Sequence, residues 1–258
     1  MFARIRKEIK EIHDQFYDII EKSDFSIITF LAFGAAFQLL SSKYLPPRVS
    51  ALLPLLWLGW RFSKSLIDSR DVFKSSFIDV VRGKYTTKLP ETSDGIVLFV
   101  LAARLNHPFG KLSPGTTPLD IVFKDIWREA ESSNREKWGY LGRTATLADT
   151  SDDIGTTTIW LSYWRDIEGL RAFATSTAHM VAHTGWEQGK YPYVGIMHET
   201  YHAPKGHHES IYFNFRRWGQ GAIQPVSGEE GGQFTFVDTL TKNKPGSNML
   251  SRMGRKHD

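Results

Sequence analysis

The chain has 258 residues, enough for one domain with appendages or for two small domains. It contains no cysteine, which excludes disulfide bonds, catalytic thiolates, thiolate-ligated haem and iron–sulfur clusters. The formal net charge is +4, but the basic residues are dispersed outside the N-terminal region, so we predict no nucleic-acid-binding surface. Aromatic residues make up 13% of the chain, which favours a large apolar pocket.

Residues 1–24 predict a basic amphipathic helix. Apolar side chains from Ile5 to Ile20 recur at helical spacing, and four basic residues cluster at the start. A helix of this kind suits an anionic membrane surface. Packing against the protein's own core explains the same pattern, so both interpretations stay open.

Two uncharged runs follow, Phe25–Ser42 and Val49–Trp60, separated by the basic segment Lys43–Arg48. The first is long enough to span a bilayer, whereas the second would measure only about 18 Å as a helix, against roughly 30 Å of hydrocarbon. The late start of the apolar run argues against a signal peptide. We expect residues 1–62 to form the amphipathic helix and a membrane-anchoring hairpin, spanning or re-entrant. A buried helical pair is the alternative.

The rest of the chain divides into three further parts. Residues 63–92 form a charged connector whose apolar residues, up to Val81, have helical spacing. Residues 93–226 carry alternating strand and helix patterns and form the main domain. Residues 227–258 are rich in Gly, Lys, Asn and Ser, and we expect a loosely structured tail apart from Phe234–Leu240.

The main domain shows a β-α-β-β-α-β order with one extra strand, which is typical of a ferredoxin-like α+β fold. The predicted strands are Gly95–Ala103, Thr144–Ala148, Thr156–Trp164, Tyr193–His202 and Glu209–Phe215, and the predicted helices are Pro118–Ser132 and Asp166–Gly185. Two helices cover only one face of such a sheet. The strand Gly95–Ala103 has no polar side, so we expect a second subunit on the other face, giving a dimeric α+β barrel.

The segment His198-Glu199-Thr200-Tyr201-His202 matches the HExxH pattern of zinc metalloproteases. That pattern binds zinc only on a helix, where residues four apart share a face. Here proline, glycine and β-branched residues around it favour a strand, in which His198 and His202 lie roughly 13 Å apart. We therefore predict a β-hairpin within Tyr191–Phe215, with His198 and Glu199 on opposite faces, and no zinc site.

Several motifs in residues 93–255 resemble one known family. They are Tyr163-Trp164-Arg165 with Leu170–Ala174, His183-x-x-Trp186, Gly195–Tyr201, Glu209-x-Ile211-Tyr212-x-Asn214 and Ser251-Arg252-Met253-Gly254. Their order and spacing resemble the fungal monooxygenase-like family typified by the polyketide-cleaving monooxygenase of fumagillin biosynthesis, itself related to the antibiotic-biosynthesis monooxygenases. The resemblance implies a dimeric α+β barrel and oxidation of a lipophilic secondary metabolite.

Oxygenation without a metal or flavin needs a base that turns the substrate into an electron-rich anion for O₂ to attack. His198 and Glu199 are the candidate catalytic bases, and only one of them can line a given pocket because they lie on opposite strand faces. Asn214 is a candidate donor to a developing oxyanion. A hydrogen bond that holds the sheet in register is the structural alternative for His198 and Glu199, and a polar contact at a strand end is the alternative for Asn214. The aromatic residues expected to line the substrate pocket are Trp160, Trp164, Tyr201 and Tyr212.

His179 and His183 have metal-ligand spacing on a helix. Helical projection, however, places them opposite the apolar stripe of Asp166–Gly185, so we expect them to face solvent, a dimer partner or the membrane. We predict no metal site. The chain has no GxGxxG, P-loop or GxSxG motif, which leaves nucleotide-cofactor and serine-triad chemistry without support.

The hydrophobic N-terminal runs favour membrane association, and the family resemblance implies a homodimeric oxidoreductase that acts on a hydrophobic polyketide or terpenoid in fungal secondary metabolism. Direct use of O₂ without a cofactor is favoured, and haem is the alternative. We expect the endoplasmic reticulum membrane, with the catalytic domain in the cytosol. The competing functions are a non-redox enzyme on the same fold, such as an isomerase, a cyclase or a haem-assisted dehydratase, and a non-catalytic membrane-bound carrier of a lipophile.

Overall fold

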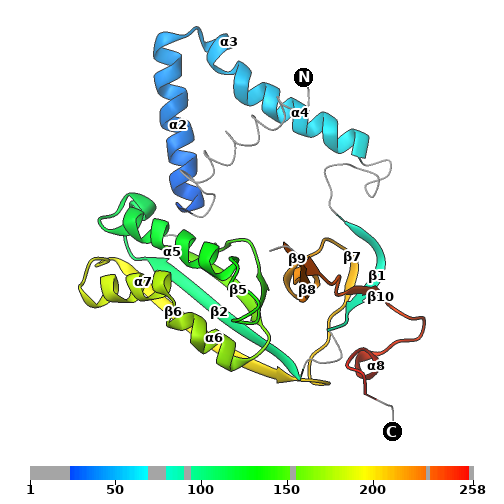
Figure 1. Ribbon diagram of the computed structural model, residues 1–258. Helices are drawn as coiled ribbons and strands as arrows, with labels where there is room; N and C mark the ends of the chain where they lie inside the picture. The colour runs from blue at the N-terminus through cyan, green and yellow to red at the C-terminus, as the bar shows by residue number, and fades with distance from the viewer. Residues whose placement is uncertain (1–23, 69–79, 90–93, 152–154, 231–232, 256–258) are drawn as a thin grey trace.

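The computed structural model describes residues 24–68, 80–89, 94–151, 155–230 and 233–255. Within these ranges the chain forms a pair of N-terminal helices, a main antiparallel sheet covered by helices on one face, and a smaller β unit (Figure 1). The predicted amphipathic helix over residues 1–24 lies outside the described residues, except for Asp24.

Both uncharged runs of the sequence are helical. The helices are α2 (Ile27–Tyr44), the short α3 (Pro47–Ser50) and α4 (Leu52–Asp68). α2 begins at Ser26, whose hydroxyl accepts a hydrogen bond from the backbone N–H of Thr29, and it ends just before a Pro-Pro pair. At the turn between the helices, the Ser50 hydroxyl accepts a hydrogen bond from Gln38 Nε2 at 3.2 Å.

The helical hairpin presents apolar side chains outward. No residue of α2 is buried, and its mean hydropathy is 1.3 over 18 residues. Among the described residues, α2 is the one helix that is long and apolar enough to cross a bilayer. α4 diverges from α2 (Figure 1) and carries Arg61, Lys64 and Asp68 in its second half.

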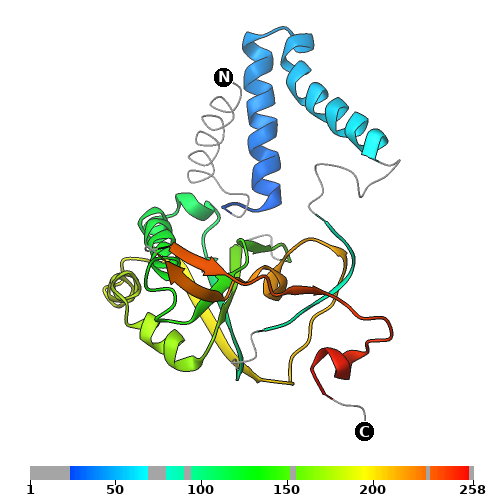
Figure 2. The same ribbon diagram turned by 45° about the vertical axis from the view of Figure 1, so that its right-hand side comes forward.

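A buried ion-pair cluster joins the base of α2 to the main domain. Lys111 lies in a 3-10 turn, η2 (Gly110–Leu112), and its ammonium group is 3.1 Å from Asp24 Oδ2 and 3.3 Å from Asp120 Oδ2. The neighbouring Gly110 has φ +48°, and a Cβ there would lie 2.3 Å from the Asp24 carbonyl oxygen. Glycine is therefore required where the two segments touch. Figures 1 and 2 both show the base of α2 beside the start of α5.

The main sheet has the strand order β3-β5-β2-β6, and all of its pairs are antiparallel. Its strands are β2 (Gly95–Leu105), β3 (Tyr140–Arg143), β5 (Thr156–Trp164) and β6 (Val194–Pro204), with the short β4 (Leu147–Asp149) also paired to β5. The helices α5 (Thr116–Ala130), α6 (Ile167–Ala174) and α7 (Thr177–Glu187) cover one face (Figure 1). The order of elements is that of the predicted ferredoxin-like arrangement. The predicted strand Thr144–Ala148 is wrong in detail, because Thr144–Thr146 separate β3 from β4.

The core lies between the main sheet and its helices, around Trp164. This side chain is 0% exposed, and its indole N–H donates to Ser162 Oγ at 2.9 Å. The rings of Tyr140 and Phe173 contact it, with centroids 5.0 and 4.9 Å away. Next to it in sequence, Arg165 forms an ion pair with Glu136 at 2.8 Å. The Tyr-Trp-Arg motif is thus explained in part by packing.

A second sheet, of order β10-β1-β7, corrects two sequence predictions. It contains β1 (Val81–Thr87), β7 (Tyr212–Phe215) and β10 (Leu240–Lys242), beside a separate hairpin of β8 (Val226–Glu230) and β9 (Gln233–Phe236). The helical connector over 63–92 is therefore wrong at its end, where residues 81–85 pair with β7 and residues 85–87 pair with β10. The loose tail over 227–258 is also wrong. Burial of Thr239 and Leu240 fixes the tail against β1, and a short helix, α8 (Met249–Arg252), follows.

The predicted hairpin over Tyr191–Phe215 is wrong as well. β6 pairs with β2 along its full length, whereas β7 pairs with β1 in the other sheet. The segment between them turns at Gly206 and is held by an ion pair between Glu209 and Arg252. This contact joins two of the sequence motifs, because Arg252 belongs to the C-terminal Ser-Arg-Met-Gly segment.

The burial of the Lys111 cluster predicts that Lys111→Met lowers the free energy of unfolding more than the same change at an exposed ion pair does. Lys111→Met leaves the carboxylates of Asp24 and Asp120 without their buried cation, so we expect the free energy of unfolding to fall by about 3 kcal/mol. Arg128→Met removes the cation of an exposed ion pair, in which the Arg128 side chain is 64% exposed and the Asp125 side chain 54% exposed. We expect the free energy of unfolding to fall by less than about 1 kcal/mol.

Both variants are measured by chemical unfolding under the same solvent conditions as the parent chain. Equal losses would show that Lys111 does not hold the hairpin to the domain. The two helices flanking the cluster should keep their far-ultraviolet circular dichroism in either variant, because neither substitution disfavours a helix.

Candidate functional site

The two candidate catalytic bases, His198 and Glu199, lie on β6, the edge strand of the main sheet. In the register with β2, His198 is opposite Leu101 and Glu199 is opposite Val100. The two side chains therefore point to opposite faces, His198 to the helix-covered face and Glu199 to the open face. In the part of the chain that the structure describes, no three His, Cys, Asp or Glu side chains group as metal ligands.

On the helix-covered face, His198 borders an aromatic group. Its ring centroid is 5.4 Å from that of Phe99 on β2. Leu101 separates His198 from Trp160 in one cross-strand row, and Trp160 stacks on Phe123 of α5 with a centroid distance of 5.4 Å. An imidazole at the edge of an apolar aromatic surface is a group that can take a proton from a flat lipophilic substrate.

His179 of α7 faces this same region, which corrects the prediction that it points away from the sheet. Its side chain is half-buried, its ring lies 6.2 Å from that of Phe173, and its Nδ1 is buried without a hydrogen-bond partner among the described residues. His183, one turn later, is exposed as predicted and lies 3.6 Å from Glu187.

The reason for this correction is a break in the predicted helix Asp166–Gly185. The chain forms α6 and α7 instead, and Glu129 of α5 fixes the junction. Its carboxylate accepts hydrogen bonds at 2.8 Å from the Ser176 hydroxyl and from the backbone N–H of Ala178. The break shifts the phase of α7, so a projection drawn through one continuous helix puts His179 on the wrong side.

Burial lowers the pKa of His179 below its ordinary value of 6.5, and the nearby imidazoles of His183 and His198 lower it further. A carbonyl contact to Ala174 and the charge of Glu129 act in the opposite direction but do not outweigh them. His179 is therefore held in its neutral form, which can accept a proton or a hydrogen bond.

On the open face of the sheet, Glu199 accepts a short hydrogen bond from the Tyr201 hydroxyl. This bond and the charge of Glu199 raise the pKa of Tyr201. The surrounding β2 and β5 residues on this face are the half-buried Leu98, Val100 and Leu161. At one end of the face, burial raises the pKa of Tyr163 to about 12.

Asn214 and Tyr212 lie in the second sheet, away from the residues of β6. Asn214 has φ +50°, and its Oδ1 accepts a hydrogen bond at 2.9 Å from the backbone N–H of Gly83, where β1 departs from regular register. The Tyr212 hydroxyl donates to the Trp218 carbonyl and accepts from the Gly221 N–H, both at 2.8 Å. These contacts give both residues a structural role.

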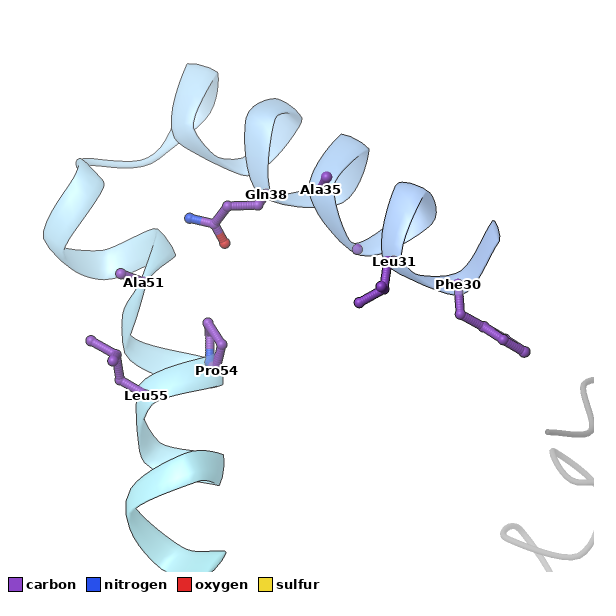
Figure 3. Close-up of a pocket in the computed structure, with 8 residues that line it drawn as sticks. Phe30, Leu31, Ala35, Gln38, Ala51, Pro54 and Leu55 are labelled. Atoms are coloured by element: carbon purple, nitrogen blue, oxygen red, sulfur yellow. The ribbon is translucent and has the colours of Figure 1, made fainter. Parts of the chain in front are cut away.

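A separate apolar groove of about 510 Å³ lies between α2 and α4. Figure 3 shows Leu31, Gln38 and Pro54 pointing toward it from the two helices. Its full lining is Phe30, Leu31, Gly34, Ala35, Gln38, Ala51, Pro54 and Leu55. The composition suits hydrocarbon, with the amide of Gln38 as the one polar group in this lining.

Comparison with known proteins finds a family and a relative that the main domain resembles. Residues 96–220 match the family model described as Monooxygenase af470-like. A curated relative, monooxygenase af470 of Aspergillus fumigatus, is 28% identical over 251 residues, which cover 90% of this chain and 89% of the relative. These two matches support an oxidoreductase, in agreement with the motif resemblance.

Solved structures with partial likeness include an oxygenase and a dehydratase. SnoaB from Streptomyces nogalater, a cofactor-independent oxygenase, is 12% identical, with a TM-score of 0.27 over 42% of this chain and 91% of its own. An aldoxime dehydratase is 15% identical, with a TM-score of 0.38 over 62% of this chain and 39% of its own. A putative antibiotic biosynthesis monooxygenase from Caulobacter crescentus is 12% identical, with a TM-score of 0.28 over 42% and 91%.

The predicted site residues do not form one pocket. Trp160 and Trp164 are buried on the helix-covered face with His198, Tyr201 lies on the open face with Glu199, and Tyr212 and Asn214 belong to the second sheet. The sequence did not reveal that Phe99 contacts His198 or that Phe123 stacks on Trp160, and it placed His179 on the wrong side of its helix. Phe99 is brought beside His198 by the register between β2 and β6, and the spacing of residues within one strand does not reveal that register.

The lowered pKa of His179 predicts a pH dependence of stability. The folded chain binds fewer protons than the unfolded chain near and below pH 6.5, so unfolding is favoured as the pH falls. His179→Gln removes this difference, and we expect the variant to lose less unfolding free energy than the parent between about pH 7 and about pH 5.

The measurement is chemical unfolding at a series of pH values. Burial also lowers the pKa of His208, so the difference between parent and variant reports His179, and the absolute slope does not. Parallel pH profiles for the two proteins would contradict a neutral, buried His179.

Proposed function

We propose that the chain is a membrane-associated monooxygenase that acts on a hydrophobic polyketide or terpenoid in fungal secondary metabolism. The observation that carries the proposal is the monooxygenase af470-like match over residues 96–220, which includes the whole of β6 and the helix-covered aromatic surface. The site of action is the region where His198 meets Phe99 and His179.

The chemistry proposed at this site uses O₂ directly. His198 takes a proton from an activated carbon of the bound substrate, and the resulting carbanion gives electrons to O₂. One oxygen atom replaces two hydrogen atoms of the substrate as a carbonyl oxygen, and the other leaves as water. The exposed edge of β6 allows entry, and the rings of Phe99 and Trp160 offer a flat apolar surface for a lipophilic substrate.

Association with a membrane is supported by the N-terminal helices. α2 is apolar, uncharged over most of its length and without buried residues. The match to the Aspergillus fumigatus relative leaves only about a tenth of this chain unmatched, so it includes a large part of residues 1–68, which are about a quarter of the chain. We propose the endoplasmic reticulum membrane, where lipophilic intermediates partition, with the monooxygenase domain in the cytosol.

A second copy of the chain is the proposed cover for the open face of the main sheet. The half-buried Leu98, Val100 and Leu161 and the exposed Met197 on this face form an apolar surface. The face is opposite to the one that α5, α6 and α7 cover. Burial of this surface in a symmetric dimer would give the predicted α+β barrel.

The dimer proposal predicts that one charged substitution on the open face halves the molecular mass in solution. The full chain of 29.4 kDa should scatter light as a dimer after subtraction of detergent, and Leu161→Lys should be a monomer, because it buries a charge in the interface. Ile121→Lys is the matched control, since Ile121 is an exposed apolar residue of α5 and lies off this face. A monomeric parent chain would contradict the proposal.

The catalytic proposal predicts that His198→Ala lowers turnover by about 10²- to 10⁴-fold while the melting temperature changes little, because His198 is exposed. His202→Ala is the matched control, an exposed histidine on the same face of β6, and should keep its activity. Oxygen consumption with a panel of lipophilic polyketides and terpenoids measures turnover, and paired melting curves measure stability.

The variant Glu199→Gln tests which face of β6 carries the reaction. If the reaction occurs on the helix-covered face, this variant keeps its turnover. Loss of turnover in Glu199→Gln together with retention in His198→Ala would move the reaction to the open face, where Tyr201 is the hydrogen-bond partner. Absence of substrate-dependent oxygen consumption in the parent chain would favour a carrier or a non-redox enzyme.

A further inference from the structure

We infer that the η2 turn of the monooxygenase domain is a second membrane contact, with Phe109 and Leu112 inserted into the interfacial region of a lipid bilayer beside α2. The inference rests on the membrane association proposed above and adds to it a surface of the domain itself. It follows from three features: a paired apolar tip, its rigid attachment to α2, and the position at which α2 becomes apolar and exposed.

The tip consists of two large apolar side chains on one side of a short turn. Phe109 immediately precedes η2 and Leu112 ends it, and the backbone N–H of Leu112 donates to the Phe109 carbonyl at 2.9 Å. In a 3-10 turn, residues three apart lie on the same side. Phe109 is 65% exposed and Leu112 is 70% exposed, so both project from the domain.

The two residues between them attach the turn to the base of α2. The Lys111 ammonium group pairs with Asp24 at 3.1 Å, and the Lys111 backbone N–H donates to the Asp24 carbonyl at 3.2 Å. The hydrogen bond to Asp24 and the charges of Asp120 and Asp24 outweigh burial, which by itself lowers the pKa, and they raise the pKa of Lys111. Lys111 therefore stays charged and the attachment persists through the physiological pH range.

The apolar surface of α2 starts directly above this attachment. Phe25 is buried against Gly110 and packs its ring on Phe30 and Phe33 at 5.5 and 5.3 Å. The next apolar residue, Ile27, is exposed, and two residues of chain span at most about 7 Å. If α2 enters the hydrocarbon at Ile27, the tip of η2 lies at the level of the headgroups, where a shallow contact reaches about 5–10 Å.

A bilayer is the occupant that these observations favour. The tip and the exposed side chains of Ile27, Ile28 and Leu31 belong to two segments that one buried ion pair joins. Two points of insertion would prevent the domain from rotating about the axis of α2. They would hold the His198 region at a constant height above the membrane.

The absence of cysteine from the chain allows a direct test. Phe109→Cys and Leu112→Cys in the full chain are each labelled with a polarity-sensitive nitrobenzoxadiazole dye and mixed with phosphatidylcholine vesicles. The control is Ser133→Cys, an exposed residue beyond the far end of α5, whose 15 residues span about 22 Å. We expect the emission at positions 109 and 112 to shift to the blue and to be quenched by lipid with a nitroxide near its headgroup, and position 133 to be unchanged.

Flotation of the same samples separates the possible failures. A chain that floats with the vesicles while both dyes remain in water overturns the inference and leaves membrane association intact. A chain that does not float overturns both. A dye response that follows protein concentration without lipid assigns the tip to a second copy of the chain, which also overturns the inference. As a second measurement, Phe109→Ser combined with Leu112→Ser should weaken vesicle partitioning relative to the parent.

Discussion

The architecture depends on the pairing of β2 with strands on both of its edges. β2 has apolar residues on both faces over most of Gly95–Ala103, so neither face can be left in water. α5, α6 and α7 cover one face, and the packing of Val97 and Trp164 fixes the register of β5 against β2. The same pairing places β6 on the other edge and orients His198 toward the aromatic core. The position of the candidate base is therefore a consequence of how the central strand is buried.

Patterns within one element predicted much of this fold from the sequence. The long apolar run of β2, the stripe of α5 and the bounded strand β5 each depend on their own residues and on periodicity. The strand character of the His198 segment was predicted for the same reason, since proline and glycine bound it and β-branched residues fill it. These are local signals, and they remain valid in the folded chain.

The failures arose where a partner distant in sequence decides the local structure. Glu129 ends one helix near Ser176, because its carboxylate accepts hydrogen bonds from the Ser176 hydroxyl and the Ala178 backbone N–H. The residues around Ser176 give no sign of this distant partner. β1 and β7 form a sheet across more than a hundred residues, so the connector and the tail were misjudged. The candidate site shares this limit. Phe99 and His179 come to His198 from two different elements, and only the strand register and the helix phase bring them together.

The edge position of β6 has a consequence for how far this strand can vary. In the described part of the chain its outer edge is unpaired, so alternate peptide groups offer N–H and C=O groups to any extended chain that approaches. From Val194 to Thr200 the strand contains one charged side chain, Glu199, and Pro204 ends it. The carboxylate of Glu199 thus limits edge-to-edge pairing of β6 with a strand of another molecule. Whatever Glu199 contributes to chemistry, neutral replacements at this position carry a cost in colloidal stability that selection would oppose.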